Sequence, residues 1–221
     1  MVAADETARL ATLRGYAVLD TPPERAFDDL VLLASMLCSA PTAYVSFVGE
    51  GRPWIKAQYG GTVDEGPREV AFCTRVIETQ APVIVADAFA DQRFADNPLV
   101  TGAPGIRFYA GVPLLAPSGH ALGALAVLDF TPRTLSESNL AALCVLADHV
   151  MIQLELRRLV LGGLSHDVNN LLTVIKFNAS LLGASTNVPE AREWLGAIVE
   201  ATNRSAELVR NLFGALRKQM T

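Results

Sequence analysis

The stretch IRFYAGVPLL (106–115) is followed, around the turn PSGH (117–120), by the stretch ALGALAVLD (121–129). Each stretch has the length of a β-strand and is almost entirely apolar, and the turn between them contains Pro and Gly. Two such runs separated by a short turn predict an antiparallel β-hairpin. We take this hairpin as the centre of the predicted fold.

Strand and helix signals alternate on the N-terminal side of this hairpin. A second hairpin is predicted from 42–48 and 54–59, and a short buried strand is predicted at 82–86. The spacing of apolar residues predicts helices over 6–14, 26–39 and 70–79. The segment 87–105 is rich in Asp, Asn, Pro and Gly, which predicts a loop. An antiparallel sheet with helices packed on it is an α+β fold.

The composition indicates a globular protein of one large or two small domains. Hydrophobic residues make up 51% of the 221 residues and charged residues 19%, which excludes a disordered chain. A net charge of −5 argues against nucleic acid or an anionic membrane as the partner. No apolar run approaches the ~18 residues of a membrane-spanning helix. The three cysteines are widely spaced without a metal-ligand pattern, so we expect reduced thiols, no metal site and a cytoplasmic protein.

The sequence changes character from Ser136 onward. Ser136 is a favourable N-cap, and a single helix is predicted to run from the first domain into the second without a flexible linker. Its apolar residues recur in steps of three and four, which predicts a coiled-coil seam: Ala147, Val150, Leu154, Leu161, Leu164, Val168, Leu171, Ile175 and Leu182. A second amphipathic helix is predicted to begin at Pro189, and it repeats the apolar pattern over 194–216. Two copies of such a helical hairpin bury their stripes as a four-helix bundle, which predicts a homodimer.

The segment LSHDVNNLL (164–172) places three polar functional groups inside this predicted helix. With seam residues at Leu161 and Leu164, His166 faces away from the seam and Asn170 lies one turn along the same face, roughly 5–6 Å away. Asp167 can hydrogen-bond the imidazole and make its other nitrogen more nucleophilic. Phosphoryl transfer needs mostly positioning and charge stabilisation, so such a sparse site suffices. On spacing alone, an ordinary solvated histidine remains an open alternative.

The N-terminal part of the chain resembles a GAF domain, the small-molecule sensor module of bacterial signalling proteins. The resemblance rests on five motifs: LDTPPE (19–24), FC (72–73), RFADNPLV (93–100), RFYAGVPL (107–114) and GALAVLD (123–129). It implies an α+β sensor domain over 1–135.

The box HDVNNLL (166–172) resembles the phosphoacceptor box of the dimerisation and histidine-phosphotransfer domain of sensor histidine kinases. The resemblance implies that His166 is the phosphorylated residue, that Asp167 is the adjacent acid that assists transfer, and that Asn170 positions the phosphoryl group or a water. The implied organisation is a connecting signalling helix over 136–160 and a helical hairpin over 161–221.

A complete kinase of this family continues into an ATP-binding domain, and no segment after Leu216 resembles one. No P-loop occurs in the sequence either. Autophosphorylation from ATP by this chain alone is therefore not expected, and whether the chain is an enzyme stays open. It is either part of a longer kinase or a protein that exchanges phosphate with others. We expect no cofactor on this chain, and Mg²⁺ only in a partner's receiver or kinase site.

The sequence thus predicts a dimeric two-component or phosphorelay protein. In this interpretation His166 exchanges a phosphoryl group with the aspartate of a response-regulator receiver domain, or takes it from a separate kinase catalytic domain, under GAF control. The alternative is a degenerate kinase that dimerises and titrates a kinase or receiver without catalysis. A third interpretation is a sensor whose output is a ligand-driven rearrangement of the dimer alone.

Other candidate residues have structural interpretations as well. Cys73 occupies a helix where some related sensors attach a bilin, but Thr74 replaces the usual histidine, so a buried structural cysteine is preferred. Four aromatic residues line a ligand pocket or belong to the core: Phe72, Phe94, Phe108 and Tyr109. His120 is interpreted as a solvated turn residue and His149 as a packing residue.

Overall fold

The computed structural model describes residues 3–61 and 66–159. The predicted phosphoacceptor residues His166, Asp167 and Asn170, and the predicted helical hairpin over 161–221, lie outside the described residues. The chain divides into two units after Glu155, and the description that follows concerns the first.

The described residues form one five-stranded antiparallel sheet with the strand order β2-β1-β5-β4-β3. Both predicted hairpins are present, and β5 lies at the centre because Ala43 of β1 and Ala110 of β4 both pair with Val127. The strands are β1 (Thr42–Val48), β2 (Pro53–Tyr59), β3 (Val83–Val85), β4 (Phe108–Leu115) and β5 (Ala121–Asp129).

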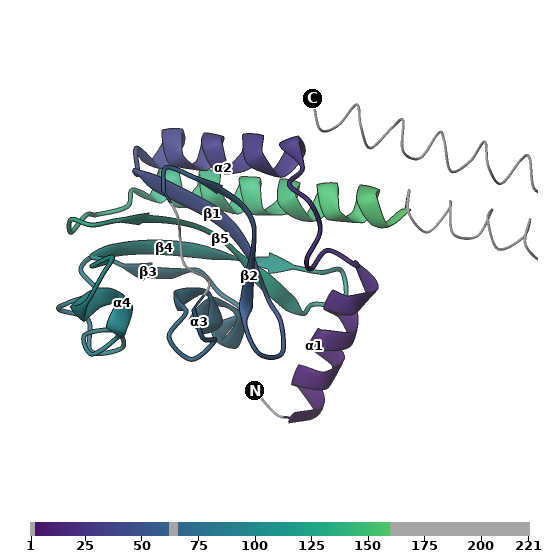
Figure 1. Cartoon of the computed structure of the whole chain (residues 1–221). Coiled ribbons are helices and arrows are strands. Elements are labelled where there is room, and N and C mark those ends of the chain that lie inside the picture. Colours follow the sequence, from purple (N-terminus) through teal and green to yellow (C-terminus); the bar gives the residue numbers. More distant parts are fainter. Residues whose placement is uncertain (1–2, 62–65, 160–221) are drawn as a thin grey trace, which may run out of the picture. The chain divides into compact units, whose positions relative to one another are not determined.

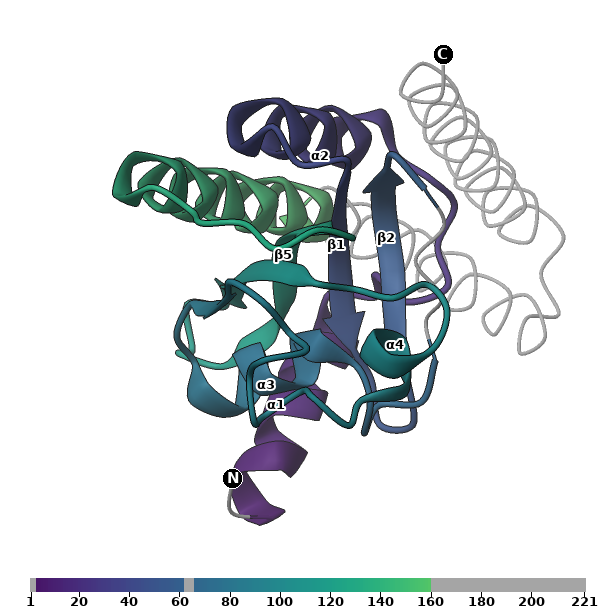
Figure 2. The same ribbon diagram turned by 90° about the vertical axis from the view of Figure 1, so that its left-hand side faces the viewer.

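Helices cover both faces of this sheet. In Figures 1 and 2, α2 and the helix Glu137–Leu159 lie side by side on one face, and α3 and α4 lie against the other. The remaining helix, α1, lies beside the end of the sheet at which the β4–β5 turn is found. The labelled helices are α1 (Ala3–Gly15), α2 (Arg25–Cys38), α3 (Phe72–Thr79) and α4 (Pro98–Thr101).

The short helix α4 was not predicted, because its segment reads as a loop. Pro98 stands in its first turn, and the Asn97 side chain accepts a hydrogen bond from the Leu99 amide at 2.9 Å. The same Asn97 side chain donates to the Val70 carbonyl at 2.7 Å. A capping residue that also ties the loop to a distant segment explains why four residues suffice for a helical turn.

Two apolar cores result from the alternation of side chains along β4 and β5. One core lies between the sheet and the pair formed by α2 and helix Glu137–Leu159, and it includes Phe108. The other lies between the sheet and α3, and it includes the neighbouring residue Tyr109. Both strands are therefore apolar on two faces, which explains the nearly continuous apolar runs in the sequence.

Helix Glu137–Leu159 begins as predicted, because the Ser136 hydroxyl accepts a hydrogen bond from the Asn139 amide at 3.1 Å. Its buried residues belong to the core of the sensor domain: Leu143, Leu146, Ala147, Val150, Met151 and Leu154. The prediction that Ala147, Val150 and Leu154 form a coiled-coil seam is therefore wrong. A stripe with a period of about 3.5 residues fits a sheet as well as a partner helix.

By length and composition alone, helix Glu137–Leu159 is also the one described helix that could cross a membrane. Its apolar composition has a different explanation in this structure. Leu143, Val150 and Leu154 are fully buried against the sheet, so that face of the helix is a core face.

The TPPE motif (21–24) surrounds the ammonium group of Lys56, which is buried on β2. Lys56 Nζ donates to Thr21 Oγ1 at 2.9 Å, to the Pro22 carbonyl at 2.7 Å and to Glu24 Oε1 at 2.6 Å. It also lies 5.3 Å from the ring centre of Phe27. The motif thus joins the start of α2 to an edge strand, through a buried charge whose donors are satisfied.

We expect Lys56→Met to lower the free energy of unfolding by about 3 kcal/mol, because the carboxylate of Glu24 then loses its buried partner. Urea unfolding of the full chain measures the loss. The matched control is Arg25→Met, whose exposed pair with Asp29 at 3.7 Å should contribute less than about 1 kcal/mol. Equal effects of the two changes would contradict this role of Lys56.

Candidate functional site

The phosphoacceptor box lies outside the described residues, so the site that the structure describes is on the sensory side. Three aromatic rings meet beneath the sheet. The Phe72 and Phe94 rings stack with centroids 4.4 Å apart, and the rings of Phe72 and Tyr109 are 4.9 Å apart. Of the four aromatic candidates, the structure brings these three together. Phe108 lies in the opposite core, because it precedes Tyr109 on the same strand.

Small residues on the sheet make room for the Tyr109 side chain. A Cβ atom on Gly111 would lie 2.2 Å from the Tyr109 hydroxyl oxygen, so the phenol extends along β4 over this glycine. Ala124 and Ala126 of β5 line the same core. Any side chain at residue 111 would displace the phenol.

Two hydroxyl groups in this region are buried without a well-formed hydrogen bond within the described part of the chain. They are Ser46 Oγ and Tyr109 Oη, and both residues are fully buried. The Cys73 thiol and the Tyr44 hydroxyl lie close to them. Buried hydroxyls are nearly always satisfied by protein, water or ligand. The name hydroxyl cluster is used below for six residues: Tyr44, Ser46, Cys73 and Tyr109, together with Phe72 and Phe94.

The hydroxyl cluster is uncharged at neutral pH. Burial raises the pKa of Cys73 to about 11, and it raises the pKa values of Tyr44 and Tyr109 above their usual range. Cys73 is thus buried, as expected for a structural cysteine, and its protonated thiol is a poor nucleophile.

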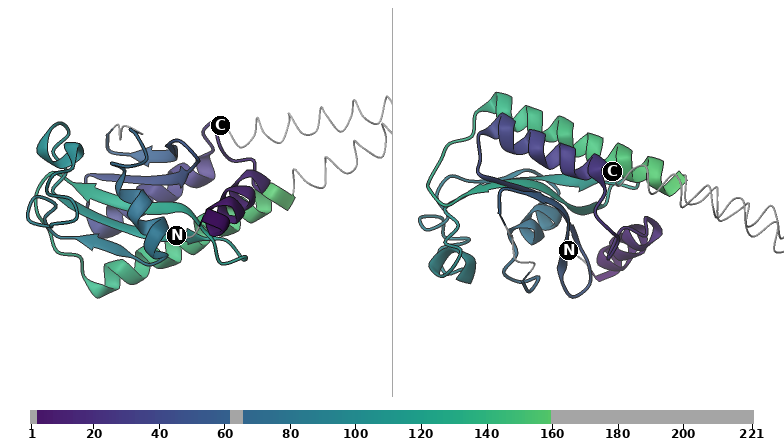
Figure 3. Two further views of the ribbon diagram at one scale, coloured as in Figure 1. Left: turned by 90° about the horizontal axis from the view of Figure 1, so that it is seen from below. Right: turned by 45° about the horizontal axis from the view of Figure 1, so that its top comes forward.

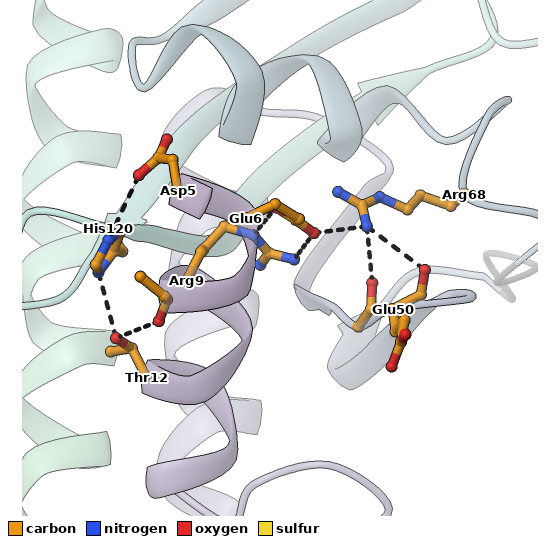
Figure 4. A network of polar contacts seen from close by, with 9 residues as sticks. Asp5, Glu6, Arg9, Thr12, Glu50, Arg68 and His120 are labelled. Carbon is orange, nitrogen blue, oxygen red and sulfur yellow. Dashed lines mark hydrogen bonds and ion pairs between the residues drawn. The ribbon is translucent and has the colours of Figure 1, made fainter. Parts of the chain in front are cut away.

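A second polar site fastens α1 to the two hairpins, and Figure 4 shows it. Arg9 forms two hydrogen bonds with the carboxylate of Glu6, at 2.7 and 2.8 Å, and Arg68 pairs with the same carboxylate at 2.8 Å. Arg68 also donates to the Gly49 carbonyl in the β1–β2 turn at 3.3 Å. The hydrogen bond from Arg9, together with Arg68, lowers the pKa of Glu6 to about 2.

His120, interpreted from sequence as a solvated turn residue, belongs to this site instead. Its Nδ1 lies 3.2 Å from Thr12 Oγ1 and 3.0 Å from Ser118 Oγ, and its Nε2 lies 3.6 Å from a carboxylate oxygen of Asp5. Thr12 and His120 are 108 residues apart in the chain, so no local pattern could have indicated this contact. His149, by contrast, is exposed, and it contacts its own helix through the Val145 carbonyl at 2.8 Å.

The C-terminal end of α1 reaches helix Glu137–Leu159. The Tyr16 hydroxyl donates a short hydrogen bond to the carboxylate of Glu155, and Tyr16 is itself buried. The segment that begins with α1 thus contacts both hairpins through Glu6, Thr12 and Asp5, and contacts helix Glu137–Leu159 through Tyr16.

We expect Glu6→Gln to lower the free energy of unfolding by about 2 kcal/mol at pH 7, because Arg9 loses its charged partner. The folded-state pKa of Glu6 is lowered, from 4.5 to about 2. Its contribution is therefore complete above about pH 4.5 and is lost as the pH falls towards 2. Urea unfolding measures the free energy of unfolding of Glu6→Gln and of the unchanged chain at pH 7 and at pH 3. The difference between the two proteins should be smaller at pH 3 than at pH 7.

The control for this prediction is Glu50→Gln, because the pair between Glu50 and Arg14 at 3.1 Å is exposed. It should change stability little at either pH. A Glu6→Gln effect of the same size at both pH values would contradict the coupling to Arg9 and Arg68.

Comparisons with solved structures agree with this fold. The GAF domain of an Acinetobacter phosphoenolpyruvate-protein phosphotransferase is 16% identical, with a TM-score of 0.50, over 70% of this chain and 95% of that one. The chromophore-binding domain of a bacteriophytochrome from R. palustris is 10% identical, with a TM-score of 0.51, over 70% of this chain and 63% of that one. At these identities the likeness concerns the fold alone.

A curated relative is closer in sequence. It is a cyclic di-GMP phosphodiesterase of Pseudomonas aeruginosa, 36% identical over 155 residues, which are 70% of this chain. The match spans only 26% of that protein's length.

Family comparisons divide the chain into two parts. Residues 22–154, more than half of the chain, match the GAF domain, and residues 156–217 match the His Kinase A (phospho-acceptor) domain. The first match includes the strands and the buried face of helix Glu137–Leu159, and the second contains the box at 166–172. The chain therefore belongs to the GAF family and carries a His Kinase A phosphoacceptor domain immediately after its GAF domain.

Proposed function

We propose that this chain is a cytoplasmic, dimeric histidine phosphoacceptor of a two-component pathway, controlled by its GAF domain. The observation that carries the proposal is the position of the box HDVNNLL inside the phosphoacceptor match over 156–217. Helix Glu137–Leu159, packed in the GAF core, leads directly into that match. Sensor and phosphoacceptor are thereby connected by a structural element of the sensor core.

In the proposed reaction, a ring nitrogen of His166 attacks the phosphorus of an aspartyl phosphate on a receiver domain. The N–P bond forms as the P–O bond to the aspartate breaks, and the carboxylate leaves; transfer to the receiver is the reverse. Asp167 holds the imidazole so that the attacking nitrogen carries its lone pair. Asn170 positions the phosphoryl group or a water. The receiver supplies Mg²⁺, which balances the phosphoryl charge.

The hydroxyl cluster is the proposed input of the GAF domain. Ser46 and Tyr109 lie on β1 and β4, the two strands that flank β5. A small neutral molecule that accepted or donated hydrogen bonds there would shift these strands, whose other faces pack against helix Glu137–Leu159. The contact between Tyr16 and Glu155 offers a second route from the hairpins to the same helix.

The phosphodiesterase activity named for the Pseudomonas relative is not proposed for this chain. About three quarters of that protein lie outside the match, which covers 26% of it. The relative supports only the proposal that the two proteins share a sensor region, which each combines with its own further domains.

We expect His166→Gln to lower phosphotransfer by at least about 100-fold, because it removes the imidazole that is proposed to accept the phosphoryl group. The purified chain is incubated with ATP alone, with a phosphorylated receiver domain, or with a separate kinase catalytic domain. Labelling is expected only with a partner. The matched control is His149→Gln, since His149 is an exposed histidine on helix Glu137–Leu159, outside the box, and it should leave labelling unchanged.

Two results would contradict the phosphoacceptor proposal. One is labelling that persists in His166→Gln. The other is receiver binding without labelling in any arm, which would assign the chain to the degenerate-kinase alternative.

We also expect Leu171→Glu to break the dimer and abolish transfer together, because Leu171 is a predicted seam residue of the four-helix bundle. Light scattering measures the oligomeric state and the same labelling assay measures transfer. A monomeric variant that still accepts phosphate would contradict the dependence of transfer on the bundle.

A further inference from the structure

Helix α1 is held to the GAF domain largely by polar side chains. It lies outside the GAF match, which begins at residue 22. Figures 1 and 3 show it beside the end of the sheet, close to the last turns of helix Glu137–Leu159. Between residues 5 and 15, its buried side chains are those of Arg9, Leu10 and Leu13. A helix with so small a buried apolar face depends on its polar contacts for its position.

The imidazole of His120, in the β4–β5 turn, lies between two residues of this helix. Its Nδ1 is 3.2 Å from Thr12 Oγ1, and its Nε2 is 3.6 Å from a carboxylate oxygen of Asp5, as Figure 4 shows. Ser118 Oγ, in the turn itself, is 3.0 Å from the same Nδ1. Both ring nitrogens thus face polar groups of α1.

The Thr12 hydroxyl restricts how the imidazole can be protonated. This hydroxyl has one hydrogen, which it donates to the Ala8 carbonyl at 2.9 Å, so it can only accept from Nδ1. A proton on Nδ1 alone satisfies this contact but leaves the lone pair of Nε2 facing the Asp5 carboxylate. A proton on Nε2 alone leaves the lone pairs of Nδ1 and Thr12 Oγ1 opposed. The imidazolium, with both nitrogens protonated, makes both contacts with α1.

The charged groups around this imidazole favour the same form. Asp5 has no other ion pair within the part of the chain that the structure describes. Glu6 and Arg9 of α1 pair with each other, and Arg68 pairs with Glu6 as well. On the adjacent long helix, Glu155 accepts the tyrosine hydroxyl described above. The other residues of the turn carry no charge, so Asp5 is the carboxylate that an imidazolium at this position would balance.

We propose that His120 is a pH-dependent latch, whose imidazolium bridges Asp5 and Thr12 and holds α1 to the β4–β5 turn. Histidine is the side chain whose charge ordinarily changes between pH 5 and 8. Because the protonated ring contacts a carboxylate in the folded protein, this stabilisation of α1 is present on the acid side of that range and is lost as the pH rises. The proposal concerns the GAF part alone and does not rest on the phosphoacceptor role of His166.

The test is hydrogen–deuterium exchange of the full chain at pH 6 and pH 8, with mass spectrometry of peptides from α1. Dividing the intrinsic exchange rate at each pH by the observed rate gives a protection factor. We expect the protection factor of α1 to be about three times higher at pH 6 than at pH 8, which is the effect of a partly exposed ion pair on an equilibrium. A peptide from β5 checks that the sheet stays folded at both pH values.

Two variants isolate the latch, and a third is the matched control. Asp5→Asn keeps the imidazole but removes the carboxylate, and His120→Gln removes the titrating ring. In both variants the ratio of the protection factors at pH 6 and pH 8 should fall to about one. His149→Gln should keep the threefold ratio, because His149 is exposed and contacts the Val145 carbonyl of its own helix.

Three results would overturn the latch. The first is a ratio near one in the unchanged chain. The second is a ratio that survives in Asp5→Asn or in His120→Gln while the β5 peptide stays protected. The third is a ratio that is lost in His149→Gln, which would assign the pH dependence of α1 to a different histidine.

Discussion

The burial of one face of helix Glu137–Leu159 against the sheet is the contact on which the rest of this structure depends. Leu143, Val150 and Leu154 are as deeply buried as the strand residues they touch, so the helix is part of the sensor core. The same helix leads into the phosphoacceptor match. Because closely packed interiors transmit displacement rather than absorb it, the sheet and the signalling helix are expected to move together.

The polar contacts of the sensor domain are arranged around this helix. Lys56 fixes the start of α2, the neighbour of helix Glu137–Leu159, and the site around Glu6 fixes α1 to both hairpins. Tyr16 then joins α1 to Glu155. The hydroxyl cluster lies on the other side of the sheet, where a bound molecule would act on β1 and β4. The hydroxyl cluster and helix Glu137–Leu159 are thus separated by one layer of strands.

Much of the fold could be predicted from the sequence, because apolar runs and turn residues are local signals. The strands of the two hairpins and α2 are within two residues of the predicted bounds. The helix α4 was missed because Asn97 stabilises it through Val70, 27 residues away. The contacts of His120 and Lys56 join distant segments, which no periodicity reveals. The stripe at Ala147, Val150 and Leu154 was recognised, but spacing does not distinguish a sheet from a partner helix. The roles of His166, Asp167 and Asn170 remain predictions.

Native-state hydrogen exchange of the full chain tests most directly whether helix Glu137–Leu159 belongs to the sensor core. The opening free energies of the amides of Val150 and Leu154 are compared with that of Val127 in the central strand β5. If the helix is part of the core, these amides share the highest opening free energy of the domain. Exchange of the helix at much lower free energy, while β5 stays protected, would show an independent linker helix and contradict the account.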